Sequence, residues 1–189
     1  MDGFSYDAAG NLTNDGTATY GYDTFNRLAV RDGVWYGYNG DGVLVTRIDD
    51  STTTYYTQGL AAPLTQVLQT TLDGTTTNAL YGLDRLAAQT GSATTWYVGD
   101  ALGSVRMTLD DTGAPLGVIN YDPWGALESG TVPTFGFTGE LQDSATGLVN
   151  LRARWYSTAQ GRFTARDPFR GVMERPKHLH SIHMLRIPL

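Results

Sequence analysis

The sequence contains no cysteine, which excludes a disulfide framework and any zinc site that depends on thiolates. Charge is also scarce, because only 17% of the residues are charged, with 13 Lys and Arg against 19 Asp and Glu. The net charge of -6 argues against a surface that neutralises phosphates, so we expect no nucleic-acid partner. Hydrophobic runs are short: no segment approaches the roughly 18 apolar residues of a membrane span, and the first residues do not resemble a signal peptide.

Glycine, tyrosine and threonine are abundant instead. The 189 residues include 23 Gly and 11 Tyr, and 41% of the chain is hydrophobic. This composition is typical of short strands joined by tight turns. The length suits one domain or one repeat array. We therefore expect a folded, all-β protein without long helices.

The tyrosines recur with a period of sixteen residues. Tyr6, Tyr22 and Tyr38 are sixteen apart, and Tyr81 and Tyr97 repeat that spacing. The first three each open a phrase with the frame Y-[DN]-x-x-[GN]-x-L, and a later stretch returns to it. A regular period of this kind indicates a repeat protein.

The frame predicts a turn. An Asp or Asn side chain accepts hydrogen bonds from the backbone that follows it, and a Gly or Asn three residues later adopts the left-handed conformation. Both features are typical of a hairpin tip with a bulge. We expect structural turns at six pairs: Asp7 and Gly10, Asp23 and Asn26, Asn39 and Gly42, Asp100 and Gly103, Asp110 and Gly113, and Asp122 and Gly125.

Between the turns, apolar and polar residues alternate with the period of two that half-buried strands show. We expect a strand at 105–109 and one long strand at 149–156, with its aromatic side inside and a basic opposite face. In the threonine-rich stretch 51–80 we expect two looser strands joined by an irregular connection. Single hairpins of this size cannot bury a core, so we predict that they stack into an extended, twisted sheet or a closed shell.

Over about residues 4–171, the period and the frame resemble the YD repeats of Rhs proteins, teneurins and Tc-toxin C components. The resemblance implies YD-repeat hairpins in residues 1–95, an Rhs repeat-associated core region in 96–171, and an irregular tail in 172–189, which we take to be truncated or frame-shifted. Six phrases in their order resemble that core region more specifically than any one of them would: Asp100–Arg106, Tyr121–Gly125, Phe137–Glu140, Gly147–Leu148, Arg152–Tyr156 and Gly161–Phe169.

The resemblance also implies a role. Family members form a strip of β-hairpins that spirals into a hollow cage around a C-terminal toxin or effector polypeptide. Such a polypeptide is therefore the expected partner, and the expected location of the parent protein is secreted or at the cell surface. We expect this chain to be a fragment of that shell, a scaffold that has no cofactor and is not an enzyme. The open strand edges of an incomplete cage would also associate with other chains.

Family members often cut their own chain with chemistry that resembles an aspartic protease. The first acid of that site maps to Asp167, and Arg162 or Arg166 is the candidate basic neighbour. The family's second Asp-Pro-x-Gly phrase is missing from residues 172–189, so we expect Asp167 to be vestigial. Asp122 is interpreted as a turn residue and not as a second catalytic carboxylate. Self-cleavage is the enzymatic alternative to the scaffold.

Three further patterns leave alternatives open. Regular tyrosines and tryptophans would suit a glycan-binding surface if they were exposed in rows, whereas cross-strand packing is the preferred interpretation. Arg152, Arg154, Arg162 and Arg166 would face a phosphate or an acidic cargo, or would form ion pairs on a solvated or cavity-lining face, which is the commoner use. The H-x-H-x-x-H pattern of 178–183 would suit a transition metal, but we expect no metal site there.

Overall fold

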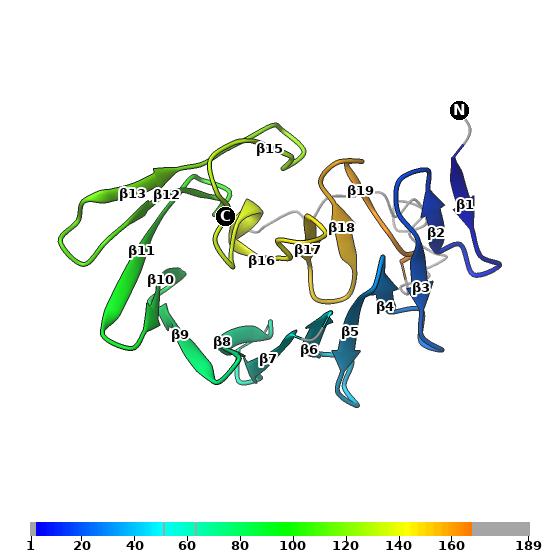
Figure 1. Cartoon of the computed structure of the whole chain (residues 1–189), viewed down its shortest axis with the longest axis horizontal. Helices are drawn as coiled ribbons and strands as arrows, with labels where there is room; N and C mark the ends of the chain where they lie inside the picture. The colour runs from blue at the N-terminus through cyan, green and yellow to red at the C-terminus, as the bar shows by residue number, and fades with distance from the viewer. Residues whose placement is uncertain (1–2, 51, 63, 168–189) are drawn as a thin grey trace, which may run out of the picture.

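A computed structural model describes residues 3–50, 52–62 and 64–167, and nearly every regular element in this part of the chain is a β-strand. Eleven strands form one antiparallel sheet in which every strand pairs with its neighbours in sequence. Figure 1 shows this sheet as a curved band, here called the strip. Its strands are β3 (Tyr20–Tyr22), β4 (Leu28–Arg31), β5 (Val34–Tyr38), β6 (Leu44–Asp49), β7 (Thr52–Gly59), β8 (Gln66–Leu72), β9 (Thr75–Tyr81), β10 (Arg85–Thr90), β11 (Ala93–Gly99), β12 (Val105–Leu109) and β13 (Pro115–Val118). The prediction of an all-β fold built from repeated hairpins is confirmed.

The chain then turns back into the concave side of the strip, where residues 132–167 form what is here called the inner segment (Figure 1). This segment contains a short 3-10 turn and a four-stranded antiparallel sheet. Two separate hairpins complete the fold, one before the strip and one between the strip and the inner segment. The bounds of these elements are β1 (Phe4–Tyr6), β2 (Leu12–Asp15), β14 (Asn120–Tyr121), β15 (Leu127–Ser129), η1 (Phe137–Gly139), β16 (Leu141–Gln142), β17 (Leu148–Asn150), β18 (Trp155–Ser157) and β19 (Arg162–Phe163).

The six turns of the sequence frame share one geometry. In the Asp122 turn, Oδ1 accepts hydrogen bonds from the N–H groups of Trp124 and Ala126, both at 2.8 Å. The Asp122 carbonyl accepts the N–H of Gly125 at 3.0 Å, and Gly125 has a φ of 89°, where glycine is favoured. The same three contacts recur in the turns that begin at Asp7, Asp23, Asn39, Asp100 and Asp110.

Two kinds of strand pair alternate from β3 to β12, and the last pair of the strip, β12–β13, breaks the alternation because it also contains a register shift. Five pairs, from β3–β4 to β11–β12, each contain a register shift of the β-bulge type near one end. The four pairs between them run in unbroken register. A bulge adds one residue to one strand and bends it, so the strip is bent in the same place in every second hairpin.

Strand alternation separates a concave face from an outer face. Tyr36 and Tyr56 are 5% and 8% exposed and belong to the core, whereas their neighbours Trp35 and Tyr55 are 55% and 56% exposed. Buried residues of the strip pack against Leu148 and other residues of the inner segment in one hydrophobic cluster. The inner segment therefore supplies the second layer that a single sheet needs in order to bury a core.

The prediction of one long strand at 149–156 is wrong. The structure has two strands there, β17 and β18, which pair in antiparallel register with Val149 opposite Tyr156. The chain reverses because Arg152 adopts a φ of 61°, and the side-chain oxygen of Asn150 accepts the N–H of Arg152 at 3.2 Å. The apolar alternation that suggested a single strand therefore continues through the loop between β17 and β18. Because the strand is interrupted there, its basic residues do not share one face of a strand.

The threonine-rich stretch contains three strands, β7, β8 and β9, where two were predicted for residues 51–80. The irregular connection lies between β7 and β8, and the additional reversal occurs at Asp73 and Gly74. These residues have φ values of 48° and 77°, which are typical of the two-residue turns that match the twist of a hairpin.

The strip continues across the predicted boundary at residue 95, which falls inside β11. The division into 1–95 and 96–171 therefore remains a prediction, and residues 172–189 lie outside the described part. Within the described residues, no helix is long and apolar enough to span a membrane.

Candidate functional site

Asp143 fastens the inner segment to the concave face of the strip. Its Oδ2 accepts hydrogen bonds from Nε of Arg47 at 2.6 Å and from the hydroxyl of Tyr36 at 2.9 Å. Its Oδ1 accepts the N–H groups of Ala145 at 2.9 Å and Thr146 at 3.1 Å. One buried carboxylate therefore shapes the turn that leads into β17 and binds that turn to β5 and β6.

The electrostatics keep this contact ionised. Burial alone would raise the pKa of Asp143, but the hydrogen bonds and charge of Arg47, together with the Tyr36 hydroxyl, hold it below its ordinary value. Burial would lower the pKa of Arg47, yet Asp143 and Asp49 raise it above the ordinary arginine value. The pKa of Tyr36 is raised by burial and by the Asp143 charge. Removal of Arg47 would leave Asp143 buried without a cation, and removal of Asp143 would leave Arg47 with the more exposed Asp49 alone; both changes are costly.

The frame tyrosines form a second set of contacts with the inner segment. The ring of Trp155 lies 4.4 Å from that of Tyr36, centroid to centroid, and its Nε1 donates to the hydroxyl of Tyr38 at 2.8 Å. The hydroxyl of Tyr22 donates to the carbonyl of Thr164 at 2.7 Å. The frame tyrosines Tyr22 and Tyr38 thus point inward, as Tyr36 does, and contact the polypeptide inside the curve.

A second aromatic cluster joins the inner segment to the β14–β15 hairpin. The Phe137 ring lies 5.8 Å from the Tyr121 ring and 6.4 Å from the Tyr156 ring. The Tyr156 hydroxyl donates to the carbonyl of Trp124 at 2.9 Å. Aromatic pairs at these distances stabilise a packed layer beyond their buried area.

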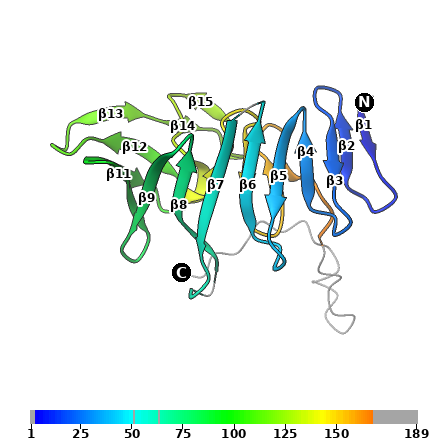
Figure 2. The same ribbon diagram turned by 60° about the horizontal axis from the view of Figure 1, so that its bottom comes forward.

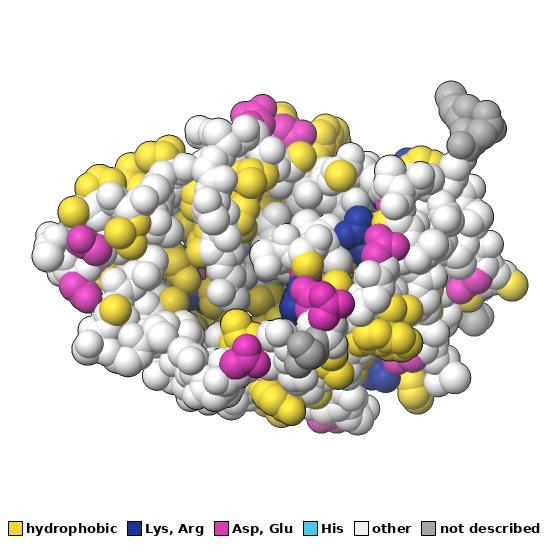
Figure 3. Space-filling view, viewed as in Figure 1, with side chains coloured by type: hydrophobic (Ala, Val, Ile, Leu, Met, Phe, Trp, Pro, Cys, Tyr) yellow, Lys and Arg dark blue, Asp and Glu magenta, His cyan; other side chains and the backbone are white. Residues whose placement is uncertain are grey.

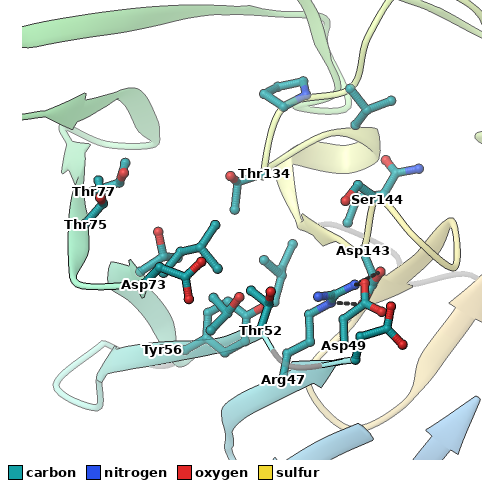
Figure 4. A pocket seen from close by; sticks show the side chains of 18 residues that line it. Arg47, Asp49, Thr52, Tyr56, Asp73, Thr75, Thr77, Thr134, Asp143 and Ser144 are labelled. Atoms are coloured by element: carbon teal, nitrogen blue, oxygen red, sulfur yellow. Dashed lines mark hydrogen bonds and ion pairs between the residues drawn. The ribbon is translucent and has the colours of Figure 1, made fainter. Parts of the chain in front are cut away.

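Between these two attachments lies a cavity of about 840 Å³. One wall is the concave face of β6–β9, and the other is formed by 132–134 and 141–144 of the inner segment. Figure 4 shows Thr75, Thr77 and Tyr56 on the strip facing Thr134 across the cavity, with the Arg47–Asp143 contact at one end. The space-filling view shows the molecule hollowed between the curve of the strip and the inner segment (Figure 3).

Two smaller cavities, of about 380 and 290 Å³, adjoin one another around a second ion pair. Both are lined by Arg85, Phe135, Glu140 and Arg152. Nη1 of Arg152 lies 2.7 Å from Oε1 of Glu140, and the guanidinium of Arg85 lies 3.4 Å from the centre of the Phe135 ring. Arg152 therefore lines both cavities and forms an ion pair there, which agrees with the cavity-lining alternative given for the four arginines.

The predicted acid, Asp167, lies at the end of the inner segment. Its Oδ2 is 2.9 Å from Nη2 of Arg154, whose guanidinium lies 3.7 Å above the centre of the Phe163 ring. Burial lowers the pKa of Arg154, and the charge of Asp167 opposes this effect. Arg154 is thus one basic partner of Asp167, and the sequence indicated it only as one of the four arginines 152, 154, 162 and 166.

The two arginines proposed as neighbours of Asp167 have contacts with the first hairpin. Nη1 of Arg162 donates to the hydroxyl of Tyr6 at 3.1 Å, and its guanidinium lies 5.3 Å from the centre of the Phe4 ring. The Arg166 side chain passes beside Gly10, because a Cβ at Gly10 would lie 3.6 Å from Cδ of Arg166. Both arginines help to hold β1 and β2 against the inner segment.

The described residues contain no group of three or more His, Cys, Asp or Glu side chains placed to hold a metal ion. The H-x-H-x-x-H pattern of 178–183 lies outside them. The cavity of about 840 Å³ presents threonine hydroxyls and carboxylates on two walls, which suits contact with a polar chain. Sequence reasoning missed the Arg47–Asp143 pair, and the only local signal was the turn-forming spacing of Asp143 and Gly147.

Comparison with known proteins gives a consistent result. The family model described as teneurin YD-shell matches residues 62–185. The tRNA3(Ser)-specific nuclease WapA of Bacillus spizizenii is 28% identical over 184 residues, which cover 88% of this chain and 8% of WapA. Teneurin-1 of Mus musculus is 27% identical over 191 residues, which cover 84% of this chain and 7% of teneurin-1. The chain thus spans less than a tenth of the length of these relatives.

Solved structures show the same fold. The crystal structure of TcdB2-TccC3 superposes with a TM-score of 0.67 at 19% identity, over 89% of this chain and 10% of that one. The Tc holotoxin pore of Photorhabdus luminescens gives a TM-score of 0.66 at 19% identity, over 86% of this chain and 9% of that one. The sixteen-residue tyrosine frame, the bulged hairpins and the match over 62–185 agree, and the chain belongs to the teneurin YD-shell family.

Proposed function

We propose that this chain forms part of the wall and inner core of a hollow YD shell that encloses a polypeptide, the C-terminal effector region of a longer parent protein. A structural shell role is the established character of the family model and of the fold. The enclosure of a polypeptide is the part that we propose here. Because the chain matches about 8% of its curated relatives, the rest of the cage would be supplied by other parts of the parent.

The observation that carries the proposal is the position of the inner segment. After the chain has formed the strip, it turns into the concave side and is held there by the buried Asp143–Arg47 contact and by the tyrosines. A cavity of about 840 Å³ remains beside it. A wall that already surrounds one stretch of its own chain, and still has room beside it, is suited to enclose more.

The names of the WapA relatives describe tRNA nucleases. We assign such activity to other regions of those long proteins, because the part that matches this chain is the shell. The net charge of -6 supports this assignment, since a surface that binds RNA would carry an excess of positive charge. We further propose that the parent protein acts outside the cell that makes it, as a carrier of enclosed cargo would.

A photocrosslinking experiment in the parent protein tests the enclosure. A photoreactive phenylalanine analogue replaces Thr77, which lines the large cavity, or Trp35, which is 55% exposed on the outer face. Crosslinks from position 77 to the C-terminal effector region, with none from position 35, are expected. Equal yields at both positions, or no crosslink from position 77, would contradict the proposal.

The enzymatic alternative is self-cleavage centred on Asp167. The observation that favours it is the tight placement of this carboxylate by Arg154, which is itself fixed over Phe163. Intact-mass spectrometry over time, at mildly acidic and at neutral pH, compares the chain with its Asp167→Ala variant. A single stable mass for both supports the scaffold. Cleavage of the unmodified chain alone would instead establish the protease.

A further inference from the structure

The cavity of about 290 Å³, here called the Asn150 cavity, is lined by two polar side chains whose bonding is incomplete. It lies between strands β6, β7, β8 and β10 of the strip and residues 140–141 and 150–153 of the inner segment. Figure 2 shows β5–β9 lying side by side, with the inner segment behind them. The two side chains are the amide of Asn150, on the inner segment, and the guanidinium of Arg85, on the strip.

The amide nitrogen of Asn150 is a buried donor without an acceptor. Asn150 is 8% exposed, and its Nδ2 has no hydrogen-bond partner among the described residues. The identity of this atom is fixed, because the N–H of Arg152 can only donate and therefore meets the side-chain oxygen, at 3.2 Å. A buried donor without an acceptor costs free energy, and native proteins satisfy nearly all such groups. A ligand atom that accepts a hydrogen bond inside the cavity would remove this cost.

The guanidinium of Arg85 is a half-buried cation that has only neutral partners. Its Nε and Nη2 donate to the hydroxyl of Tyr81 at 3.1 and 2.7 Å, and its Nη1 donates to the carbonyl of Gly139. In the part of the chain that the structure describes, no carboxylate forms an ion pair with Arg85, whereas Arg152 in the same cavity is paired with Glu140. The positive charge of Arg85 is therefore not balanced by an ion pair, which favours the approach of an anion.

The rest of the lining selects among anions. Leu44, Val67 and Phe135 line the cavity and are each 8% exposed or less, so part of the ligand meets an apolar wall. The carboxylates of Glu140 and of the exposed Asp41 also line the cavity, and they would repel a ligand that carries two negative charges. A carboxylate carries one charge, and its two oxygens can accept hydrogen bonds from a guanidinium and from an amide at the same time.

We propose that the Asn150 cavity binds a carboxylate that is attached to an apolar group. The carboxylate accepts hydrogen bonds from Nδ2 of Asn150 and from the guanidinium of Arg85, and the apolar group packs against Leu44, Val67 and Phe135. Two sources present this chemistry: a small organic acid, and the carboxyl terminus of a polypeptide that ends in an apolar residue. The experiment below separates them.

This site goes beyond the proposed shell function and does not depend on it. Its lining belongs to this chain, and the binding of free probe molecules tests it. The cavity of about 840 Å³, where position 77 tests the enclosure, is a separate space whose lining shares Leu141 with the Asn150 cavity. Failure of one proposal therefore leaves the other standing.

The test is isothermal titration calorimetry of the full chain with two acids that share one apolar group. Hydrocinnamate represents the small organic acid, and N-acetylglycylphenylalanine represents the carboxyl terminus of a polypeptide. Hydrocinnamamide, in which an amide replaces the carboxylate, is the uncharged comparison. We expect at least one acid to bind and the amide to give no heat. Binding of hydrocinnamate alone identifies a small acid as the ligand, and binding of the dipeptide identifies a chain terminus.

Three variants locate the binding. Arg85→Gln removes the cation and should weaken binding of the acid about tenfold, as the loss of one charge-assisted hydrogen bond would. Asn150→Asp keeps the oxygen that accepts the N–H of Arg152, replaces the free donor with a second oxygen, and should abolish binding. Arg106→Gln is the matched control, because Arg106 is paired with Asp100 and does not line the Asn150 cavity, and it should leave the affinity unchanged.

Three results would overturn the proposal. One is the absence of binding of either acid to the unmodified chain. Another is equal affinity for hydrocinnamate and hydrocinnamamide, because the cavity would then hold only the apolar group. The third is an affinity in Arg85→Gln equal to that in Arg106→Gln, because the acid would then bind elsewhere. Circular dichroism verifies that each variant keeps the sheet, and if Asn150→Asp does not fold, the half-buried Arg85→Gln decides alone.

Discussion

The carboxylate of Asp143 accepts a 2.6 Å hydrogen bond from Nε of Arg47, a residue 96 positions earlier in the chain. The exposed fractions of these two side chains are 2% and 12%. The contact joins the inner segment to β6 of the strip and lies at one end of the large cavity. It is therefore one of the contacts that hold the inner segment inside the curve.

We expect Asp143→Asn to lower the free energy of unfolding by about 3 kcal/mol, because Arg47 would lose its buried counter-charge and keep only the more exposed Asp49. Urea denaturation followed by tryptophan fluorescence measures the change. Asp73→Asn, in an exposed turn, is the matched control and should change the stability by less than about 0.5 kcal/mol. Similar small effects for both variants would show that the buried pair does not hold the inner segment.

A double-mutant cycle separates the pair from its surroundings. Arg47→Met alone should also be strongly destabilising, since Asp143 would lose its cation. Arg47→Met combined with Asp143→Asn should be less destabilised than the sum of the single variants by about 1 to 3 kcal/mol, because both charges are then absent. Additive effects, within about 0.5 kcal/mol, would mean that the two side chains act independently.

Acid should destabilise the fold through the aspartates. The folded-state pKa values of Asp143, Asp23 and Asp100 lie below the ordinary value of 3.8. The unfolded state therefore binds more protons in this range, so this stability is present above the unfolded pKa and is lost as pH falls through the folded pKa. Urea denaturation should give a constant free energy of unfolding between pH 7 and about pH 5 and a decrease below about pH 4. An increase in stability on acidification would refute this.

Alkali should destabilise the fold through the inward tyrosines. Burial raises the pKa values of Tyr20, Tyr97 and Tyr121 to about 12, above the ordinary value of 10.0. Above the ordinary value the unfolded state ionises first, so stability should decrease as pH rises from about 10 to about 12. Spectrophotometric titration of the folded protein should show a population of tyrosines that ionises only near pH 12. A single ionisation near the ordinary value, with the sheet intact, would argue against the inward placement.

Two turn glycines allow the free-energy cost of backbone strain to be measured separately from the cost of a steric clash with the inner segment. Gly125 and Gly33 have φ values of 89° and 87°, so an alanine at either position is strained. A Cβ at Gly33 meets nothing within 4 Å, whereas one at Gly125 would collide with the Phe137 ring. We expect Gly33→Ala to cost about 1 kcal/mol and Gly125→Ala to cost about 2 kcal/mol more, by thermal denaturation. Equal costs would show that the β14–β15 turn does not press on the inner segment.

Local features of this fold could be predicted from the sequence, because each depends on residues that are near in the chain. The turn at Asp122 requires only a side-chain acceptor and a residue that tolerates positive φ three positions later. The frame tyrosines signalled a repeat, and the resemblance then supplied the curved strip. The reversal at Arg152 was missed because a residue other than glycine or asparagine occupies the left-handed position there.

Contacts between distant parts of the chain could not be predicted in the same way. Nothing in the pattern around Arg47 indicates a partner 96 residues later, and nothing in the pattern around Arg154 indicates its ion pair with Asp167. Such pairs depend on how far the strip curves and where the chain re-enters it. Which side chains face the concave side, such as Tyr36, and which face outward, such as Trp35 and Trp96, likewise could not be predicted without the register of the strands.

The alternation of bulged and unbroken hairpins has a geometric consequence. Because the bulge recurs at the same end of every second pair from β3–β4 to β11–β12, the curvature of the wall is set by the repeating unit, and the number of units does not change it. Insertion of further hairpins would lengthen a spiral of unchanged width. Deletion of the extra residue within a bulge would remove the bend at that strand pair and flatten the sheet locally.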